Sequence, residues 1–237
     1  MRILVTRPQG ASRRTSQRLK ALGHDPVTLP VTEARHHPDE VRDALDKPYS
    51  ALLVTSAEAI RVAQSPGTGL AGHLGATVFT VGEATARAAR EAGFSDVEAA
   101  EGTGASMVRL FAGRWSRLAS AVPLLYLAGW PRSPSLEAGL AELRIPHTVA
   151  RAYTMRPLEV APEAMTAALR RPPVDAVLFY SRETARRFFE LAAVDDVPGH
   201  ARLLCLSGNI MEAVPEALRP NVRISARPDE DSLLALL

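Results

Sequence analysis

An apolar run that ends in serine occurs twice in this chain, as Ala51–Ser56 and again 125 residues later as Ala176–Ser181. Each serine is followed two residues later by a glutamate, Glu58 or Glu183, and then by a helical pattern. At the same offset, Val78–Gly82 aligns with Leu203–Ser207. A period of half the chain exceeds the roughly 20–50 residues of a solenoid repeat. The duplication therefore predicts two similar domains, with the functional surface in the cleft between them.

Short apolar runs alternate with helical patterns along the whole chain, and glycines such as Gly23 and Gly93 end helices. Such alternation predicts parallel sheets covered by helices on both faces, the α/β class. We expect strands at residues 3–5, 27–31, 51–54, 77–81, 97–99, 124–127, 148–153, 176–179, 203–206 and 222–224, and helices that include 12–22, 39–45, 83–92, 106–117, 136–143, 160–169, 182–191, 209–218 and 229–237. Ligands of such sheets bind beyond the carboxyl ends of the strands.

The bulk composition excludes several classes of protein. Among the 237 residues the net charge is only +2, and paired arginines are too scattered to form a nucleic-acid-binding stripe. No apolar stretch reaches the roughly 18 residues of a membrane span, and the N-terminus lacks the apolar core of a signal peptide. The single Cys205 fits a reducing cytosol, where it is expected to act as a small buried hydrophobe.

Arginine dominates the cations, since Lys20 and Lys47 are the only lysines among 28 cationic residues. Genomic base composition explains this bias, and so does a cleft that binds a polyanionic ligand, because arginine grips carboxylates bidentately. Phosphate-loop, dinucleotide, HExxH, CxxC and GxSxG motifs are all missing from the sequence. The adjacent His36 and His37 lie in an expected linker and are interpreted as solvated side chains, so no metal site is predicted.

Hydroxyl residues lie where predicted strands give way to helices, at Thr55, Ser56 and Ser181. A hydroxyl there caps the helix by accepting a hydrogen bond from free amides of the first turn. The remaining amides and the helix dipole can also bind an anionic group. Both interpretations fit, and the recurrence of the pattern in the two halves favours an anion site as much as capping alone.

Six segments, in order along the chain, resemble those of uroporphyrinogen-III synthases. The opening Ile3–Pro8 resembles the family's "lvTRP" start, Leu53–Ser56 its Thr-Ser strand end, Val81–Ala86 its "vG-x-x-T-a" turn, Leu125–Gly129 with Arg132 and Leu136 its "G…R…L" segment, Ala152–Thr154 its "vY-x-t" strand and Phe179–Ser181 its "f-x-S" turn. The resemblance implies two flavodoxin-like domains joined by a two-stranded linker, one inserted in the other. Residues 1–33 and 155–237 would form domain 1 and residues 37–150 domain 2, with linkers at about 32–36 and 151–154.

The resemblance also implies an enzyme, a cyclising lyase of tetrapyrrole biosynthesis on the way to heme, siroheme or cobalamin. The family closes linear hydroxymethylbilane to uroporphyrinogen III through a spiro intermediate, with loss of water and inversion of ring D, and without metal or organic cofactor. A cytoplasmic monomer is implied, with hydroxymethylbilane as its substrate and a transient handover from hydroxymethylbilane synthase. No nucleic-acid or membrane partner is implied.

Residues that match the family's motifs are the candidate site. Tyr153 matches the family tyrosine at the cleft and is the candidate acid, although an aromatic packed on the linker is an equal interpretation. Candidate carboxylate ligands are Arg7, Arg132 and Arg182, and Arg182 could equally be solvated in a first helical turn. The remaining candidate substrate contacts are Thr55, Ser56, Gly82, Thr85, Gly129, Ser181, Ser207, Gly208 and Asn209.

The chain departs from the family pattern after Ser207-Gly208, where Asn209-Ile210 stands in place of the expected threonine. Asn209 can still cap a helix and donate a hydrogen bond, whereas Ile210 cannot. The contacts of this turn with the substrate are therefore open. A degenerate relative of the family without catalytic activity is an alternative. A two-domain α/β module that binds a tetrapyrrole or another small anion without turning it over competes with the enzyme. Turnover of hydroxymethylbilane separates the two.

Overall fold

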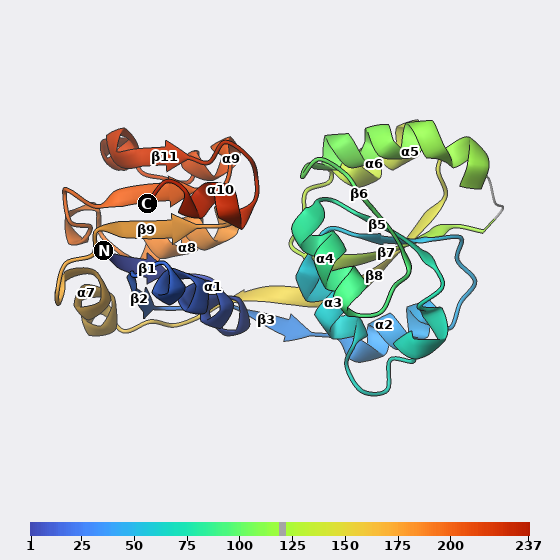
Figure 1. Ribbon diagram of the computed structural model, residues 1–237, viewed down its shortest axis with the longest axis horizontal. Coiled ribbons are helices and arrows are strands. Elements are labelled where there is room, and N and C mark those ends of the chain that lie inside the picture. The colour runs from blue at the N-terminus through green and yellow to red at the C-terminus, as the bar shows by residue number, and fades with distance from the viewer. Residues whose placement is uncertain (119–121) are drawn as a thin grey trace. The chain divides into compact units, whose positions relative to one another are not determined.

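The computed structural model describes residues 1–118 and 122–237, which fall into two compact units. Unit 1 comprises Met1–Ala34 and Arg156–Leu237, and unit 2 comprises Arg35–Met155. Each unit is built on a sheet of parallel strands with helices packed against it (Figure 1). The α/β fold class with parallel sheets is thereby confirmed.

The five-stranded sheet of unit 1 joins segments from the two ends of the chain. Its order is β11 (Val222–Ile224), β10 (Arg202–Cys205), β9 (Ala176–Phe179), β1 (Arg2–Val5) and β2 (Asp25–Thr28). All neighbours run parallel, and Figure 1 shows the blue β1 beside the orange β9. Numbered along the unit, the order is 2-1-3-4-5, which is the flavodoxin order.

Alternate side chains of these strands enter two separate cores. Leu4, Val177 and Phe179 face one side, and Ile3 and Leu178 face the other. The first face is covered by α7 (Pro162–Arg170), α8 (Arg182–Leu191) and α9 (Gly208–Met211), and the second by α1 (Gln9–Ala21) and α10 (Glu230–Leu234). This period of two, with both faces apolar, is what a parallel strand requires.

Cys205 is fully buried on β10, as the sequence predicts, and burial raises the pKa of its thiol to about 12. A thiol with such a pKa stays protonated at neutral pH. Cys205 therefore packs as a small apolar residue.

The sheet of unit 2 has the order β3 (Thr32–His36), β8 (His147–Pro157), β7 (Leu124–Trp130), β4 (Leu52–Val54), β5 (Thr77–Thr80) and β6 (Asp96–Ala99). The strands from β8 to β6 are parallel. The strands β7 and β8, last in the unit's sequence, occupy the places that β1 and β2 hold in unit 1. The opening strands of each repeat therefore pair with the later strands of the other repeat.

Helices again cover both faces of this sheet. Leu52, Val54 and Leu127 pack towards α2 (Pro38–Leu45), α3 (Ala57–Ala63) and α4 (Glu83–Glu91). Leu53 and Phe79 pack towards α5 (Gly104–Leu118) and α6 (Ser135–Glu142). Short 3₁₀ helices at Leu70–His73, Val194–Asp196 and Glu216–Asn221 complete the two units. Within the described part of the chain, every helix is too short or too polar to span a bilayer.

Several expected element boundaries were wrong. The helix expected at residues 209–218 is interrupted, because α9 ends at Met211 and a 3₁₀ helix begins only at Glu216. Pro215 lies between the two, and proline cannot donate the backbone hydrogen bond that would continue the helix. The strand expected at residues 27–31 ends at Thr28, before Pro30, and it is an edge strand.

The close approach of α6 to α5 depends on a glycine. A Cβ added at Gly139 would lie 2.4 Å from Cγ2 of Val108, whose β-branched side chain has little rotamer freedom. We expect Gly139→Ala to lower the free energy of unfolding by about 1–3 kcal/mol, as overpacking does, despite the better helix propensity of alanine. The measurement is urea denaturation. The control is Gly113→Ala on α5, where an added Cβ would meet no atom of the surrounding structure within 4 Å. It is expected to leave the free energy of unfolding unchanged or to raise it.

Candidate functional site

The predicted site residues of unit 2 gather at the carboxyl ends of neighbouring strands. Thr55 and Ser56 follow β4, Gly82 follows β5 two residues after its end, and Gly129 lies near the end of β7. Because β7, β4 and β5 are adjacent and parallel, these residues share one edge of the sheet. We call it the unit 2 edge. It is the edge at which ligands of open α/β sheets bind.

Tyr153 lies on β8 and reaches the start of α3. Ser56 is the N-cap of α3, and its Oγ accepts a hydrogen bond of 3.1 Å from the backbone N–H of Glu58. Burial raises the pKa of the Tyr153 phenol, and the side chain of the same serine, which lies close to the hydroxyl, acts in the opposite direction. The phenol is therefore neutral at physiological pH, where it can donate a hydrogen bond.

The ring of Tyr153 lies directly over a glycine. A Cβ at Gly129 would be 2.3 Å from Cζ and 2.4 Å from the hydroxyl oxygen of Tyr153. The pairing of β7 with β8 is irregular at this point, because Ala128 is opposite Arg151 and Gly129 is opposite Tyr153. The bulge and the glycine together allow the ring to occupy this place. The structure thus brings together Tyr153, Ser56 and Gly129, three of the predicted site residues.

Thr55 contacts a tyrosine that was not among the candidates. Its Oγ1 lies 3.0 Å from the hydroxyl of Tyr126, which is 2% exposed on β7. Burial raises the pKa of Tyr126. The sequence did carry a signal for this residue, because a tyrosine in the middle of a buried strand needs a partner for its hydroxyl.

Arg132, a predicted carboxylate ligand, is already paired within unit 2. Its Nε and Nη2 donate hydrogen bonds of 2.6 and 2.9 Å to the two carboxylate oxygens of Glu137. Its guanidinium also stacks 3.7 Å above the ring of Trp130, which is 42% exposed. Hydrogen bonding by Arg132 lowers the pKa of Glu137. A bidentate pair of this kind shows that the guanidinium has the geometry to bind a carboxylate.

Gly82 and Thr85 lie at the start of α4. Gly82 is its N-cap, and an added Cβ would lie 3.3 Å from Cα of Gly102. The backbone N–H of Thr85 donates to the carbonyl of Gly82 over 3.0 Å, and Thr85 is buried. The free amides of this turn are therefore more accessible to a ligand than the threonine side chain.

Unit 1 has a corresponding edge, at the ends of β9 and β10. Ser181 caps α8, with its Oγ accepting a 3.2 Å hydrogen bond from the N–H of Thr184. Ser207 is the N-cap residue of α9, but its hydroxyl donates to Oδ1 of Asn209 over 2.9 Å. Gly208 and Asn209 are exposed in the first turn of α9. The exposed Arg182 lies 3.4 Å from a carboxylate oxygen of Glu212.

Arg7, the first predicted carboxylate ligand, takes part in a half-buried network. Its Nη1 is 3.1 Å from Glu230 on α10, and its guanidinium lies 3.8 Å from the centre of the Tyr180 ring. Glu230 also accepts hydrogen bonds from Thr15 and Tyr180 over 2.6 and 2.7 Å. Burial alone would raise the pKa of Glu230, but these hydrogen bonds and the charge of Arg7 hold it below its usual value.

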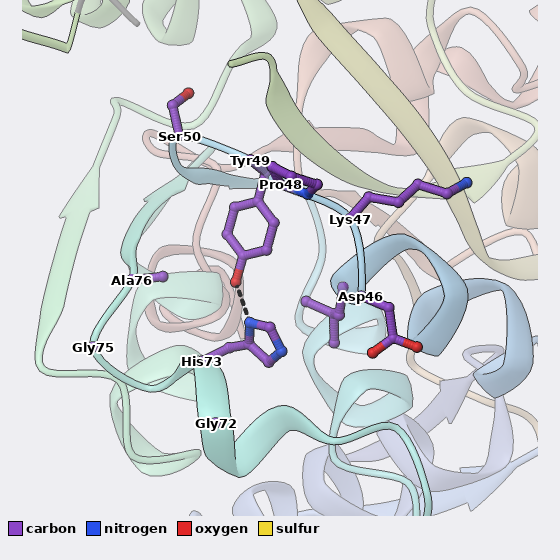
Figure 2. Close-up of a pocket in the computed structure, with 10 residues that line it drawn as sticks. Asp46, Lys47, Pro48, Tyr49, Ser50, Gly72, His73, Gly75 and Ala76 are labelled. Atoms are coloured by element: carbon purple, nitrogen blue, oxygen red, sulfur yellow. Dashed lines mark hydrogen bonds between the residues drawn. The ribbon is translucent and has the colours of Figure 1, made fainter.

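A hollow of about 540 Å³ lies at the opposite, amino-terminal edge of the unit 2 sheet. Figure 2 shows Tyr49 and His73 pointing towards each other in it, with the hydroxyl 2.6 Å from Nδ1. Asp46, Lys47 and Ser50 also line it, and none of the predicted site residues does. A smaller hollow of about 450 Å³ is lined by residues that include Trp130, Arg132 and Glu137, close to the end of β7.

Comparison with known proteins points to one family. The family model described as uroporphyrinogen-III synthase HemD matches residues 13–235. The uroporphyrinogen-III synthetase structure from Helicobacter pylori is 18% identical, with a TM-score of 0.64 and coverage of 100% of this chain and 98% of that one. A mutant uroporphyrinogen III synthase from Thermus thermophilus is 22% identical, with a TM-score of 0.56 and coverage of 99% and 96%.

At these identities the solved structures show a shared fold, whereas the family model covers nearly the whole sequence. No curated protein matches the chain in sequence. The match over residues 13–235 agrees with the resemblance in the strand-end turns and with the two parallel sheets. The chain belongs to the uroporphyrinogen-III synthase family, whose members are cyclising lyases of tetrapyrrole biosynthesis.

Proposed function

We propose that this chain closes hydroxymethylbilane to uroporphyrinogen III, with loss of water and inversion of ring D. Membership of the family over residues 13–235 supports the reaction, and the cluster of Tyr153, Ser56 and Gly129 supports the place where it occurs. We also propose residues 1–33 with 155–237, and 37–150, as the two domains. Finer parts of the proposal are a cytoplasmic monomer and a transient handover of substrate from hydroxymethylbilane synthase.

The reaction makes three demands on the protein. A flexible molecule with eight carboxylates must be held in a ring-closing conformation, the hydroxyl of its terminal hydroxymethyl group must leave, and the resulting cationic azafulvene must survive until ring D attacks it in the inverted sense. Holding the ends of the molecule together supplies much of the rate, because proximity and orientation replace an entropic barrier. A hydrogen-bond donor near the hydroxyl helps it to depart as water.

Tyr153 is proposed as that donor. Its hydroxyl is neutral at physiological pH because burial raises its pKa, its ring packs over Gly129, and the side chain of Ser56 lies close to it. Ser56 is in turn fixed by its capping bond to the N–H of Glu58. A rigidly held neutral phenol can hydrogen-bond to the leaving oxygen without placing a negative charge beside the azafulvene.

The carboxylates of the substrate are proposed to bind hydroxyls, amides and arginines. Free backbone N–H groups at the starts of α4 and α8, next to Gly82 and Ser181, can bind an anion. Arg7, Arg132 and Arg182 each pair with a glutamate, so each would exchange a protein carboxylate for one from the substrate. The remaining proposed contacts are Thr55, Thr85, Gly129, Ser207, Gly208 and Asn209.

Turnover is tested directly by supplying freshly generated hydroxymethylbilane, oxidising the products and resolving the type I and type III isomers. We expect type III to predominate, well above the product of spontaneous closure. Formation of type I alone, at the spontaneous rate, would mean that the fold is kept without the chemistry and would favour a binding module.

Removal of the Tyr153 hydroxyl should slow the reaction without stopping it, because holding the substrate contributes independently of proton donation. We expect Tyr153→Phe to lower kcat by up to about 100-fold, near the lower end of the contribution of general acids. Steady-state kinetics of type III formation measure the effect. Complete loss of activity in a folded variant, or an unchanged kcat, would contradict the role given to Tyr153.

The position of the Tyr153 ring should depend on Gly129. Because an added Cβ would lie 2.3 Å from the ring, Gly129→Ala must displace it, and we expect a fall in kcat similar to that of Tyr153→Phe. Combining the two substitutions should add little to either. Gly10→Ala is the matched control, because an added Cβ there would meet no atom of the surrounding structure within 4 Å, and it should keep wild-type kinetics. Wild-type kcat in Gly129→Ala would show that the ring position does not matter.

A further inference from the structure

The duplicated serine–glutamate motif has different surroundings in its two copies. Glu58 and Glu183 each pair with the arginine three residues later, Arg61 and Arg186. Glu58 is also contacted by a histidine, because Nε2 of His36 lies 2.7 Å from its Oε1. The side chain of Glu58 is 20% exposed, against 47% for Glu183. Among the described residues, the copy in unit 2 thus carries a histidine partner that its duplicate lacks.

Glu58 is held as a carboxylate between an arginine and a histidine. Nε of Arg61 donates to Oε2 over 2.9 Å, and His36 occupies Oε1. Burial acts to raise the pKa of Glu58, but the hydrogen bonds and charges of Arg61 and His36 outweigh it and lower the pKa. Since Glu58 lies in the first turn of α3, its negative charge is further favoured by the helix dipole.

His36 lies beside Tyr153. The backbone N–H of His37 donates to the carbonyl of Ala152 over 2.8 Å. His36 and Tyr153 therefore flank the same inter-strand hydrogen bond. The phenol of Tyr153 lies close enough to Ser56, two residues before the carboxylate that holds His36, for this serine to lower its pKa. The histidine and the tyrosine therefore contact the same turn of α3.

The second ring nitrogen of His36 is available for chemistry. The side chain is 40% exposed, and within the described residues Nδ1 has no recorded partner. A carboxylate on one nitrogen of an imidazole fixes the orientation of the ring and leaves the other nitrogen to contact a ligand.

Charges on the neighbouring elements are largely balanced. On α3, Arg61 and Glu58 form a pair. Between β8 and α2, Nη2 of Arg151 lies 2.6 Å from Glu40, which His37 also approaches at 3.9 Å. Tyr153 also lies in this region, and its raised pKa makes the phenol a weak acid. Unlike His37, whose Nε2 lies 2.9 Å from Oγ1 of Thr154, His36 is held by a carboxylate, which makes it the histidine placed to act as a proton donor.

We propose that Glu58 positions His36 as a proton donor to the leaving hydroxyl of the substrate's terminal hydroxymethyl group, beside the hydrogen bond from Tyr153. This inference rests on the proposed function. The imidazolium gives its Nδ1 proton to the hydroxyl oxygen, the C–O bond breaks, and its electron pair leaves with the oxygen as water. The cationic azafulvene and a neutral imidazole remain. The imidazole recovers a proton when ring closure releases one from a pyrrole carbon.

The test is the pH dependence of type III formation in two variants with matched controls. We expect His36→Gln to lower kcat by about 100-fold, with KM within about twofold, and to lose the fall in rate that the wild type shows as pH rises. Glu58→Gln should move that fall to lower pH, because the imidazolium loses its anionic partner. The controls are Glu183→Gln, which loses the equivalent arginine pair, and His200→Gln, an exposed histidine 4.0 Å from Asp175. Both should behave as wild type.

A wild-type kcat and pH profile in His36→Gln would overturn the inference, and so would equal effects of Glu58→Gln and Glu183→Gln. Loss of activity from misfolding alone would not move the pH profile, so the shift in Glu58→Gln keeps the test decisive. If the wild type itself produces no type III above background, the proposed function fails and the inference fails with it. Failure of the inference alone leaves wild-type turnover intact.

Discussion

A parallel sheet that buries both of its faces leaves little room for polar side chains except at the ends of its strands. In unit 1, side chains such as Leu4 and Ile3 point to opposite faces, and both faces are closed by helices. The same holds in unit 2 for Leu52 and Leu53. The hydroxyls, glycines and arginines of the candidate site follow the strands as a direct consequence.

The exchange of opening strands between the repeats decides which residues share an edge. Because β7 and β8 complete the sheet that contains β4 and β5, Tyr153 on β8 comes to lie beside Ser56, which is far earlier in the chain. Without that exchange the tyrosine and the serine would belong to different sheets. The two copies of the duplicated motif share one feature, because the serine caps its helix in both units. Among the described residues, a histidine joins the glutamate in unit 2 alone.

Local features of this fold could be predicted from the sequence, because they depend on neighbouring residues. The alternating strands, the N-caps at Ser56 and Ser181 and the buried Cys205 all follow from local patterning. Pro215 likewise gave a signal that the helix after Ser207 would be interrupted, and the expected boundaries overlooked it. Interactions between distant residues could not be predicted in the same way. Arg7 pairs with Glu230, 223 residues away, and no periodicity or spacing connects the two.

The four tyrosines of the chain report on both edges of unit 2 and on unit 1. The most direct measurement is therefore the NMR spectrum of protein labelled with ¹³C at tyrosine Cζ, recorded while reduced uroporphyrinogen III is added. If the substrate site lies at the unit 2 edge, the resonances of Tyr153 and Tyr126 will shift and that of Tyr49, in the opposite hollow, will not. A shift at Tyr49 with Tyr153 unchanged would place the ligand at the wrong edge and contradict the proposed site.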